Sequence, residues 1–154
     1  MESTPFNDTE VRQEVSTAYL LRQVAERLAI SLTQALKPFN QSTSAYRVLI
    51  ALTRNNPSSM RELIEATLIA PSTLSRTIDA LEKEGCVACS PVENDARARQ
   101  VTLTQTGEQQ LQEILPAAVA QYDWAIQNID PEELRAMHKT LKKMLQNLKT
   151  SPIK

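Results

Sequence analysis

The length, composition and charge of the chain narrow the classes of protein to consider. Of its 154 residues 17 are basic and 18 acidic, and this length suits a single domain with a full hydrophobic core. The resulting net charge of −1 argues mildly against nucleic acid as a partner, because a basic domain is one footprint of DNA binding. No apolar run approaches the roughly 20 residues of a membrane span, and the polar, acidic start lacks a signal-peptide pattern. With only two cysteines, these features indicate a cytoplasmic protein.

The first part of the chain predicts a long helix followed by a shorter one. Residues 9–37 contain no proline or glycine, and apolar side chains recur there at the spacing of an amphipathic helix. These apolar positions are Val11, Val15, Ala18, Leu21, Ala25, Leu28, Leu32 and Leu36. Pro38 ends this helix, and Ser42 is placed to cap a second helix that bears Leu49 and Leu52.

Two short helices and a hairpin are predicted in the middle of the chain. Ser59, with Glu62 three residues later, forms the capping-box signature of a third helix. A fourth helix is predicted over residues 71–84 and stops at Gly85. A strand pattern, a charged tip at residues 93–99 and a return strand follow. Short helices followed by a β-hairpin describe a winged helix-turn-helix.

The last part of the chain predicts two more helices. Apolar residues at helical spacing follow Gly107, with a bend expected near Pro116. They are Leu111, Leu115, Ala118, Tyr122, Ala125 and Ile129. Asp130, Pro131 and two glutamates supply a capping side chain, a proline for the first turn and acids against the helix dipole. The apolar positions of this final helix are Leu134, Met137, Leu141, Leu145 and Leu148.

A set of short motifs stands in order over about fifty residues of the middle region. They are Leu81-Glu82-Lys83-Glu84-Gly85, Asp95-Ala96-Arg97, Val101-Thr102-Leu103-Thr104 and Gly107. Together they resemble the MarR family of bacterial transcription regulators. The resemblance implies a mainly α fold with a small β-hairpin wing, in which long N- and C-terminal helices dimerise. It also implies a single domain over residues 1–154, with the winged core at about 42–104 and dimerisation helices at about 9–37 and 105–150.

Three features of the sequence depart from the pattern of that family. Leu68 stands in the turn before the fourth helix, where a glycine is common, and Cys89 and Ser90 stand where basic residues often begin the wing. Ala70 occupies the expected N-cap of the fourth helix, and the missing capping oxygen costs on the order of 1 kcal/mol. Pro71, preset for the first helical position, partly offsets that cost.

The fourth helix is the expected recognition helix. Helical spacing places Leu74, Ile78 and Leu81 on one buried face. Recognition helices present their N-terminal residues to base edges, and no acid occurs in this helix before Asp79. The predicted DNA contacts on this helix are therefore Ser72, Thr73, Ser75 and Arg76. The alternative for the arginine is an exposed side chain that pairs with Asp79.

The wing supplies the other predicted DNA contacts. Arg97 at the tip is expected to reach into the minor groove, where narrowing strengthens the negative potential, and Arg99 is a second predicted contact. The resemblance implies that Asp95 braces the wing. The alternative is a set of solvated surface pairs that contribute little stability.

The spacing of Cys86 and Cys89 invites a zinc or disulfide interpretation, which we do not favour. On one strand, residues three apart point to opposite faces and lie roughly 10 Å apart, whereas a disulfide needs Cα atoms within about 7 Å. With no second cysteine pair and His138 as the one histidine, no metal site is expected. Core packing is predicted for Cys86 and exposure for Cys89.

An effector cavity is predicted where the first, second and fifth helices meet, the usual site in the family. Tyr19, Arg22 and Tyr46 are the candidate lining residues, and an arginine beside aromatic rings suits a small aromatic carboxylate. The alternative is that these three are ordinary core and surface residues. Trp124 and His138 are interpreted as residues of the dimer helices.

The sequence as a whole predicts a cytoplasmic, homodimeric, MarR-like repressor that binds a pseudo-palindromic operator in double-stranded DNA and is released by a small effector. The alternative for the dimer is that the terminal stripes pack on each other within one subunit. Two other functions stay open: an oxidation-sensing regulator acting through Cys89, and a winged-helix module for protein–protein contact. No catalytic constellation and no cofactor motif are present in the sequence, so an enzyme is not expected.

Overall fold

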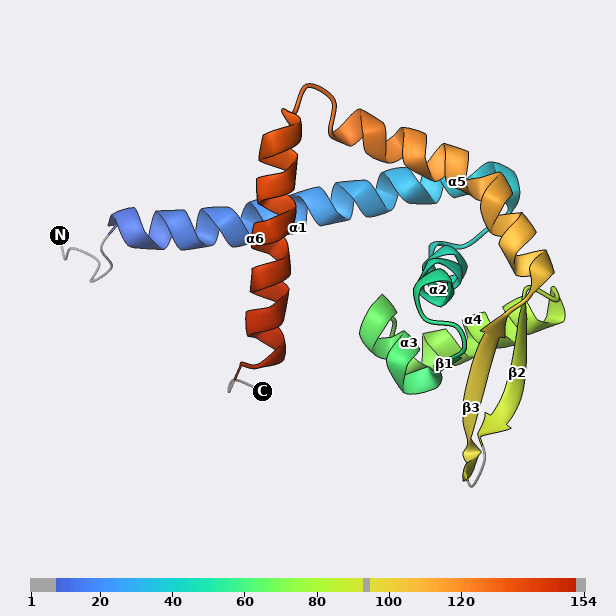
Figure 1. Cartoon of the computed structure of the whole chain (residues 1–154). Coiled ribbons are helices and arrows are strands. Elements are labelled where there is room, and N and C mark those ends of the chain that lie inside the picture. Colours follow the sequence, from blue (N-terminus) through green and yellow to red (C-terminus); the bar gives the residue numbers. More distant parts are fainter. Residues whose placement is uncertain (1–7, 93–94, 152–154) are drawn as a thin grey trace. The chain divides into compact units, whose positions relative to one another are not determined.

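The computed structural model describes residues 8–92 and 95–151 (Figure 1), and side chains within residues 16–91 and 99–151. The expected fold class is confirmed, because helices predominate and one small antiparallel sheet accompanies them. The elements are α1 (Asp8–Leu36), a 3-10 turn (Lys37–Phe39), α2 (Thr43–Arg54), β1 (Ser58–Ser59), α3 (Met60–Thr67), α4 (Pro71–Lys83), β2 (Val87–Val92), β3 (Asp95–Leu103), α5 (Gln105–Ala125) and α6 (Pro131–Lys149).

Side chains cap the helices where the sequence predicts that they should. The hydroxyl of Ser42 accepts a hydrogen bond from the Ala45 N–H at 3.0 Å. At the start of α3, Ser59 and Glu62 form a reciprocal capping box, in which each side chain accepts from the backbone N–H of the other residue. Asp130 begins α6 with a second capping box. These bonds satisfy N–H groups that have no partner within their helix.

The sheet is ordered β1-β3-β2 and is antiparallel throughout. On the central strand, Val101 lies opposite both Ser58 of β1 and Cys89 of β2. The register between β2 and β3 shifts between Pro91 and Val92. A shift of this kind bends a hairpin and increases its twist.

The hydrophobic core lies between α2, α3, α4 and the β2–β3 hairpin, and α5 adds Leu111 to it. Its buried residues are Ala45, Val48, Leu49, Leu52, Leu63, Ile69, Leu74, Ile78, Leu81, Cys86, Val87, Val101, Leu103 and Leu111. The members on α2 and α4 recur every three or four residues, which is the spacing that places them on one face of each helix. The winged unit therefore has a core of its own.

The two glycines of the chain lie at junctions between elements, Gly85 between α4 and β2 and Gly107 near the start of α5. Gly85 follows α4 with φ +74°, a left-handed conformation that a residue without Cβ adopts most easily. At Gly107 a Cβ would lie 2.2 Å from the carbonyl oxygen of Cys86. The close approach of α5 to the segment before β2 therefore requires a glycine.

The chain divides into two compact units, residues 1–121 and 122–154. None of the residues of α6 is buried in the single chain. Large apolar side chains are exposed on α1, α5 and α6, namely Tyr19, Leu20, Leu21, Val24, Ile30, Val119, Tyr122, Trp124, Met137, Met144, Leu145 and Leu148. The predicted limits of the winged core and the dimerisation helices stay a prediction.

Candidate nucleic-acid interface

α4 has one buried face and one free face. On the buried face, Leu74 and Ile78 are fully buried and Leu81 is almost fully buried. On the other side Ser72, Thr73 and Arg76 are exposed and Ser75 is half-buried. The structure thus brings the four residues predicted to contact DNA together on the first turns of one helix, and their contact with DNA stays a prediction.

The N-terminus of α4 carries no capping side chain and no acid in its first turn. Ala70 occupies the N-cap and Pro71 the first helical position, as the sequence predicts. The backbone N–H groups at this end are left for an outside acceptor, and the helix dipole favours a negative charge there. This end of α4 is therefore suited to a phosphate oxygen.

The turn before α4 is made without a glycine. Leu68 ends α3 in the left-handed conformation, with φ 54°, and its N–H donates to the Ile64 carbonyl at 2.8 Å. Its side chain is 80% exposed. A residue with a Cβ is strained in this conformation, so the chain keeps the turn geometry typical of a glycine at a cost in energy.

Arg99 connects the wing to α4. Its two terminal nitrogens donate to Asp79 at 2.9 Å and to Glu82 at 3.0 Å. The hydrogen bond to Asp79 raises the pKa of Arg99 above its ordinary value. The sequence predicts Arg99 as a DNA contact, and these two carboxylate partners were not predicted. The spacing of Asp79 and Glu82, three residues apart on a helix, is a signal from which a shared cation could have been predicted.

The other two wing residues of the prediction cannot be placed in the same way. Asp95 and Arg97 belong to β3, but their side chains lie outside the described residues. The bracing role of Asp95 and the groove contact of Arg97 stay predictions.

The two cysteines are separate free thiols. Cys86 is buried one residue before β2, as predicted, and its thiol donates to the Gln110 side chain at 3.1 Å. Cys89 is half-buried against the core, so the prediction of an exposed side chain is wrong. Burial raises the pKa of the Cys89 thiol, although the charge of Arg99 opposes that effect.

The three residues of the predicted effector pocket lie in different surroundings. Tyr19 is exposed on α1 and accepts a hydrogen bond from Gln23, and Arg22 pairs with Glu26 at 2.9 Å on the same helix. Tyr46 is half-buried on α2, where burial raises its pKa. Neither of the two α1 residues lines the cavity that Tyr46 lines.

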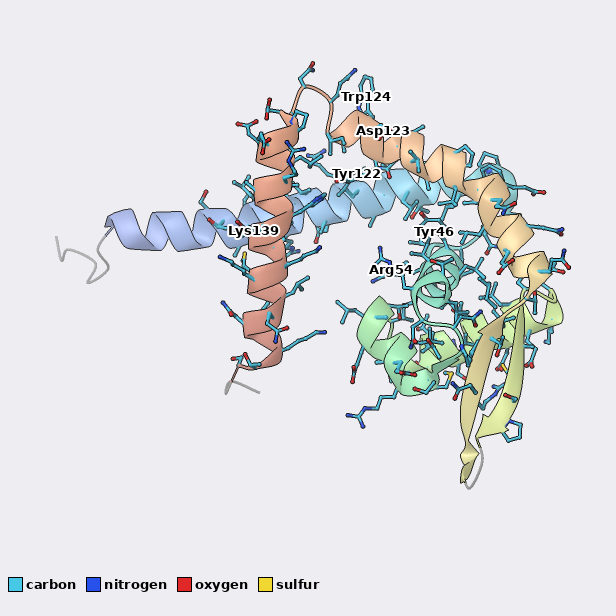
Figure 2. All side chains as sticks on the ribbon, viewed as in Figure 1. Tyr46, Arg54, Tyr122, Asp123, Trp124 and Lys139 are labelled. Atoms are coloured by element: carbon cyan, nitrogen blue, oxygen red, sulfur yellow. The ribbon has the colours of Figure 1, made fainter. Side chains whose placement is uncertain are left out.

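Tyr46 instead lines a cavity of about 220 Å³ between α2 and α3. Ile50 and Arg54 follow it at intervals of four residues and line the same cavity, so one face of α2 offers a ring, an apolar side chain and a cation. Figure 2 labels Tyr46 and Arg54 on this helix. Arg54 has no ion-pair partner among the residues that the structure describes. Arg54 is not among the pocket residues predicted from the sequence, although its spacing from Tyr46 could have suggested it.

Trp124 and His138 are two residues that the sequence places on the dimer helices. Trp124 at the end of α5 is 77% exposed, and the His138 ring lies 3.4 Å from the hydroxyl of Tyr122. Among the described residues, no cluster of histidine, cysteine and acidic side chains is able to hold a metal ion. Within the same residues no helix is long and apolar enough to span a membrane.

The fold and the free face of α4 define a winged helix-turn-helix protein, the class that inserts one helix into the major groove of DNA. The sequence profile of the MarR family matches residues 41–98. The transcriptional repressor NicR of Pseudomonas putida KT2440 is 32% identical to this chain over 96% of its length and 90% of that protein. The chain belongs to the MarR family, and is a DNA-binding transcriptional repressor of the MarR type.

Solved structures agree with this assignment. A MarR-family regulator from Silicibacter pomeroyi superposes with a TM-score of 0.83 at 28% identity, over 96% of this chain and all of that one. BpsR of Bordetella bronchiseptica, whose DNA binding is regulated by 6-hydroxynicotinic acid, superposes with a TM-score of 0.75 at 26% identity, over 84% of this chain and 98% of that one. The proteins of this family are DNA-binding regulators rather than enzymes.

Proposed function

We propose that the protein represses transcription as a cytoplasmic homodimer bound to a pseudo-palindromic operator. The observation that carries the dimer is the set of exposed apolar side chains on α1, α5 and α6, the helices outside the winged core. A two-fold dimer places two recognition helices one turn of DNA apart, so the modest contacts of each half-site combine. Burial of these apolar faces against a second copy supplies the free energy of association.

Each subunit contacts one half-site through α4 and the wing. The exposed hydroxyls and the arginine near the start of α4 bind phosphates and base edges in the major groove; these residues are Ser72, Thr73, Ser75 and Arg76. Arg97 reaches the adjacent minor groove, and Asp95 braces the hairpin that carries it. The uncapped N-terminus of α4 supports this orientation.

Selection of bound sequences from a random duplex pool tests operator binding. We expect recovered duplexes to contain two related half-sites, and Arg97→Ala to weaken binding to them by ~1–3 kcal/mol while the fold is kept. If Arg97 touches only phosphate, the loss is equal on all sequences and the salt dependence becomes shallower. If no sequence is enriched, and if retention of the protein on DNA does not depend on salt, the alternative of a winged-helix module for protein–protein contact is favoured instead.

The release step of the proposal requires a small effector, which we take to be an aromatic acid. The cavity beside Tyr46 is lined by the apolar Ile50 and the cation of Arg54, and a ring beside a cation suits an aromatic carboxylate. Glu62 also lines the cavity, where its carboxylate is bonded to Ser59 in the capping box. An aromatic acid regulates DNA binding by BpsR, which supports the same class of ligand here. An effector that prefers a spacing of the recognition helices unable to bind DNA lowers operator affinity by linkage.

Two arginine variants decide which pocket takes the carboxylate. Aromatic acids should raise the melting temperature, because they bind the folded state, and should loosen operator binding. Arg54→Ala removes this response if the α2–α3 cavity is the site, whereas Arg22→Ala removes it if Tyr19, Arg22 and Tyr46 form a pocket in the dimer. The position of Arg54 in the cavity favours the first result. If no aromatic acid shifts either observable, the effector belongs to another class.

Oxidation sensing through Cys89 receives less support from the structure. The thiolate is the reactive form of a cysteine, and sensor thiols are exposed and have lowered pKa values. Cys89 is half-buried and its pKa is raised. Both properties disfavour a peroxide-reactive thiol.

A further inference from the structure

Arg99 holds two carboxylates of the recognition helix at once. One terminal nitrogen donates to Asp79 Oδ1 at 2.9 Å, and the other donates to Glu82 Oε2 at 3.0 Å. The two acids are three residues apart on α4 and so lie on the same side of the helix. The planar guanidinium has a fixed fork of donors that can bind both acids together, which a lysine ammonium cannot reproduce in the same geometry.

Glu82 also contacts the other strand of the wing, β2. Its other oxygen, Oε1, accepts a hydrogen bond from the Cys89 N–H at 3.1 Å. Glu82 is therefore bonded to β2 through a backbone group and to β3 through the Arg99 side chain. We call Asp79, Glu82, Cys89 and Arg99 the wing junction.

The wing junction lies where the regular pairing of the hairpin ends. Arg99 is opposite Pro91, and the register shifts immediately after Pro91. Toward the core the two strands are held by ladder hydrogen bonds and by buried side chains such as Val101. A bulged hairpin changes direction at its irregularity, so a bond to α4 at this point determines the direction in which the rest of the wing leaves the core.

The charges of the junction matter because DNA is a polyanion. The side chains of Asp79, Glu82 and Arg99 are only half-exposed, with relative exposures of 51%, 40% and 39%. An isolated exposed pair contributes little, but a network that shares one guanidinium is the kind of exception that contributes more. Unpaired carboxylates at this position on the recognition helix would repel the phosphates of a bound duplex.

We propose that Arg99 is a positioning residue of the operator-binding surface. It fixes the wing against α4 through Asp79 and Glu82, and so sets the place at which Arg97, two residues nearer the hairpin turn, meets DNA. The inference rests on the proposed operator binding by α4 and the wing. It replaces a direct contact between Arg99 and DNA with an indirect role.

A binding experiment with three variants tests this role. Equilibrium binding of a fluorescent duplex recovered by selection is measured over a series of salt concentrations. The variants are Arg99→Ala, the double substitution Asp79→Asn with Glu82→Gln, and the triple combination. Arg135→Ala is the matched control, because Arg135 is an exposed arginine that pairs with Glu132 on its own helix, α6, outside the winged core.

The expected result separates positioning from simple electrostatics. Arg99→Ala should weaken binding by about threefold to thirtyfold, which lies within the range of coupling energies in an ion-pair network, with an unchanged salt slope. The double variant removes two negative charges yet should also weaken binding, because it replaces the charge-assisted hydrogen bonds of the junction with weaker neutral ones. The triple variant should bind no more weakly than Arg99→Ala, and Arg99→Lys should recover only part of the loss.

The opposite pattern would overturn the inference. A direct phosphate contact predicts that Arg99→Ala lowers the salt slope by about one and that the double variant binds as tightly as the wild type or more tightly. Unchanged affinity of Arg99→Ala would also refute the role. All variants are checked for a cooperative thermal transition, which shows that the fold is kept, and Arg135→Ala should bind like the wild type.

Hydrogen exchange in the free protein keeps the junction testable without DNA. The Cys89 amide donates to Glu82, and an amide whose acceptor is held less firmly exchanges faster. Faster exchange at Cys89 is expected in both Arg99→Ala and the double variant, and unchanged exchange in both would refute the junction. Failure of the wild-type protein to bind any selected duplex would instead contradict operator binding and leave the exchange result to decide the junction.

Discussion

The winged core buries its apolar side chains, whereas the terminal helices leave many of theirs exposed in the single chain. In the core, Leu74 and Ile78 of α4 are fully buried, and buried residues of five elements surround them. On α6 no residue is buried, and Leu145 and Leu148 are 58% and 70% exposed. Both helices are strongly amphipathic in sequence, so the difference lies in what covers the apolar face and not in the pattern itself.

This contrast shows that an amphipathic pattern specifies a face but not its partner. The apolar face of α4 is covered by residues of the same chain. The corresponding face of α6 is uncovered in one chain, and we propose that a second copy covers it. Stability of the core should therefore be a property of the monomer, whereas the state of the terminal helices should depend on protein concentration.

The largest expected effect comes from placing charges on α6. Leu145→Lys combined with Leu148→Lys should remove roughly 1.5–3 kcal/mol of burial for each leucine from the free energy of dimerisation. Sedimentation should show a monomer at concentrations where the wild type is a dimer, and operator binding should be lost with the dimer. Lys143→Gln, an exposed change on the same helix, is the control. A double variant that sediments like the wild type would contradict the proposed role of α6.

A substitution in the core should act on a single subunit. Ile78→Ala removes a fully buried side chain and should lower the free energy of unfolding by about 2–5 kcal/mol. Arg76→Ala, two residues away on the exposed face, should change it by about 0.5 kcal/mol or less. Denaturant unfolding of both variants measures the difference. A cost for Ile78→Ala as small as that of Arg76→Ala would contradict the assignment of α4's buried face.

The elements and the core could be predicted from sequence because their signals are local. Capping residues such as Ser42 and Ser59, the helical spacing on α4 and the position of Gly85 each act within a few residues. All of them are found where they were predicted. The DNA-facing side of α4 followed directly, since it is the side opposite Leu74 and Ile78.

The partners of individual side chains could not be predicted in the same way. The contact of Arg99 with Asp79 joins residues twenty positions apart, and it depends on the angle between a helix and a hairpin. Strand alternation predicts an exposed Cys89, because it places this residue on the face opposite to Cys86. It does not predict what covers that face, and the prediction of exposure is therefore wrong. The cavity of Tyr46 and Arg54 likewise depends on the packing of α2 against α3.

The turn before α4 offers a smaller test of how the core is built. Leu68→Gly should stabilise the fold by a net of roughly 1 kcal/mol. It removes the strain of a residue with a Cβ in the left-handed conformation, and this gain is larger than the extra entropy that a glycine loses on folding. Leu68→Ala keeps the Cβ and removes only an exposed side chain, so it should bring no such gain. Urea midpoints compare the three proteins. If glycine proves less stable than alanine, the conformation of Leu68 is not strained.

The smallest expected effect is a pH dependence at the edge of the core. Burial raises the pKa of Cys89, so the thiolate forms at a higher pH than in an unfolded chain. Alkylation of Cys89 by iodoacetamide, followed by peptide mapping, should therefore be slower than that of the denatured protein at pH 8 and should still be rising at pH 9. The contribution of the protonated thiol to stability is fully present below the ordinary thiol pKa and is lost as pH rises through the pKa of the folded state.

Arg99→Ala should slow alkylation of Cys89 further, because the nearby cation lowers the pKa of this thiol. Alkylation of native Cys89 as fast as that of the denatured chain would contradict its burial and return it to the exposed edge of the wing.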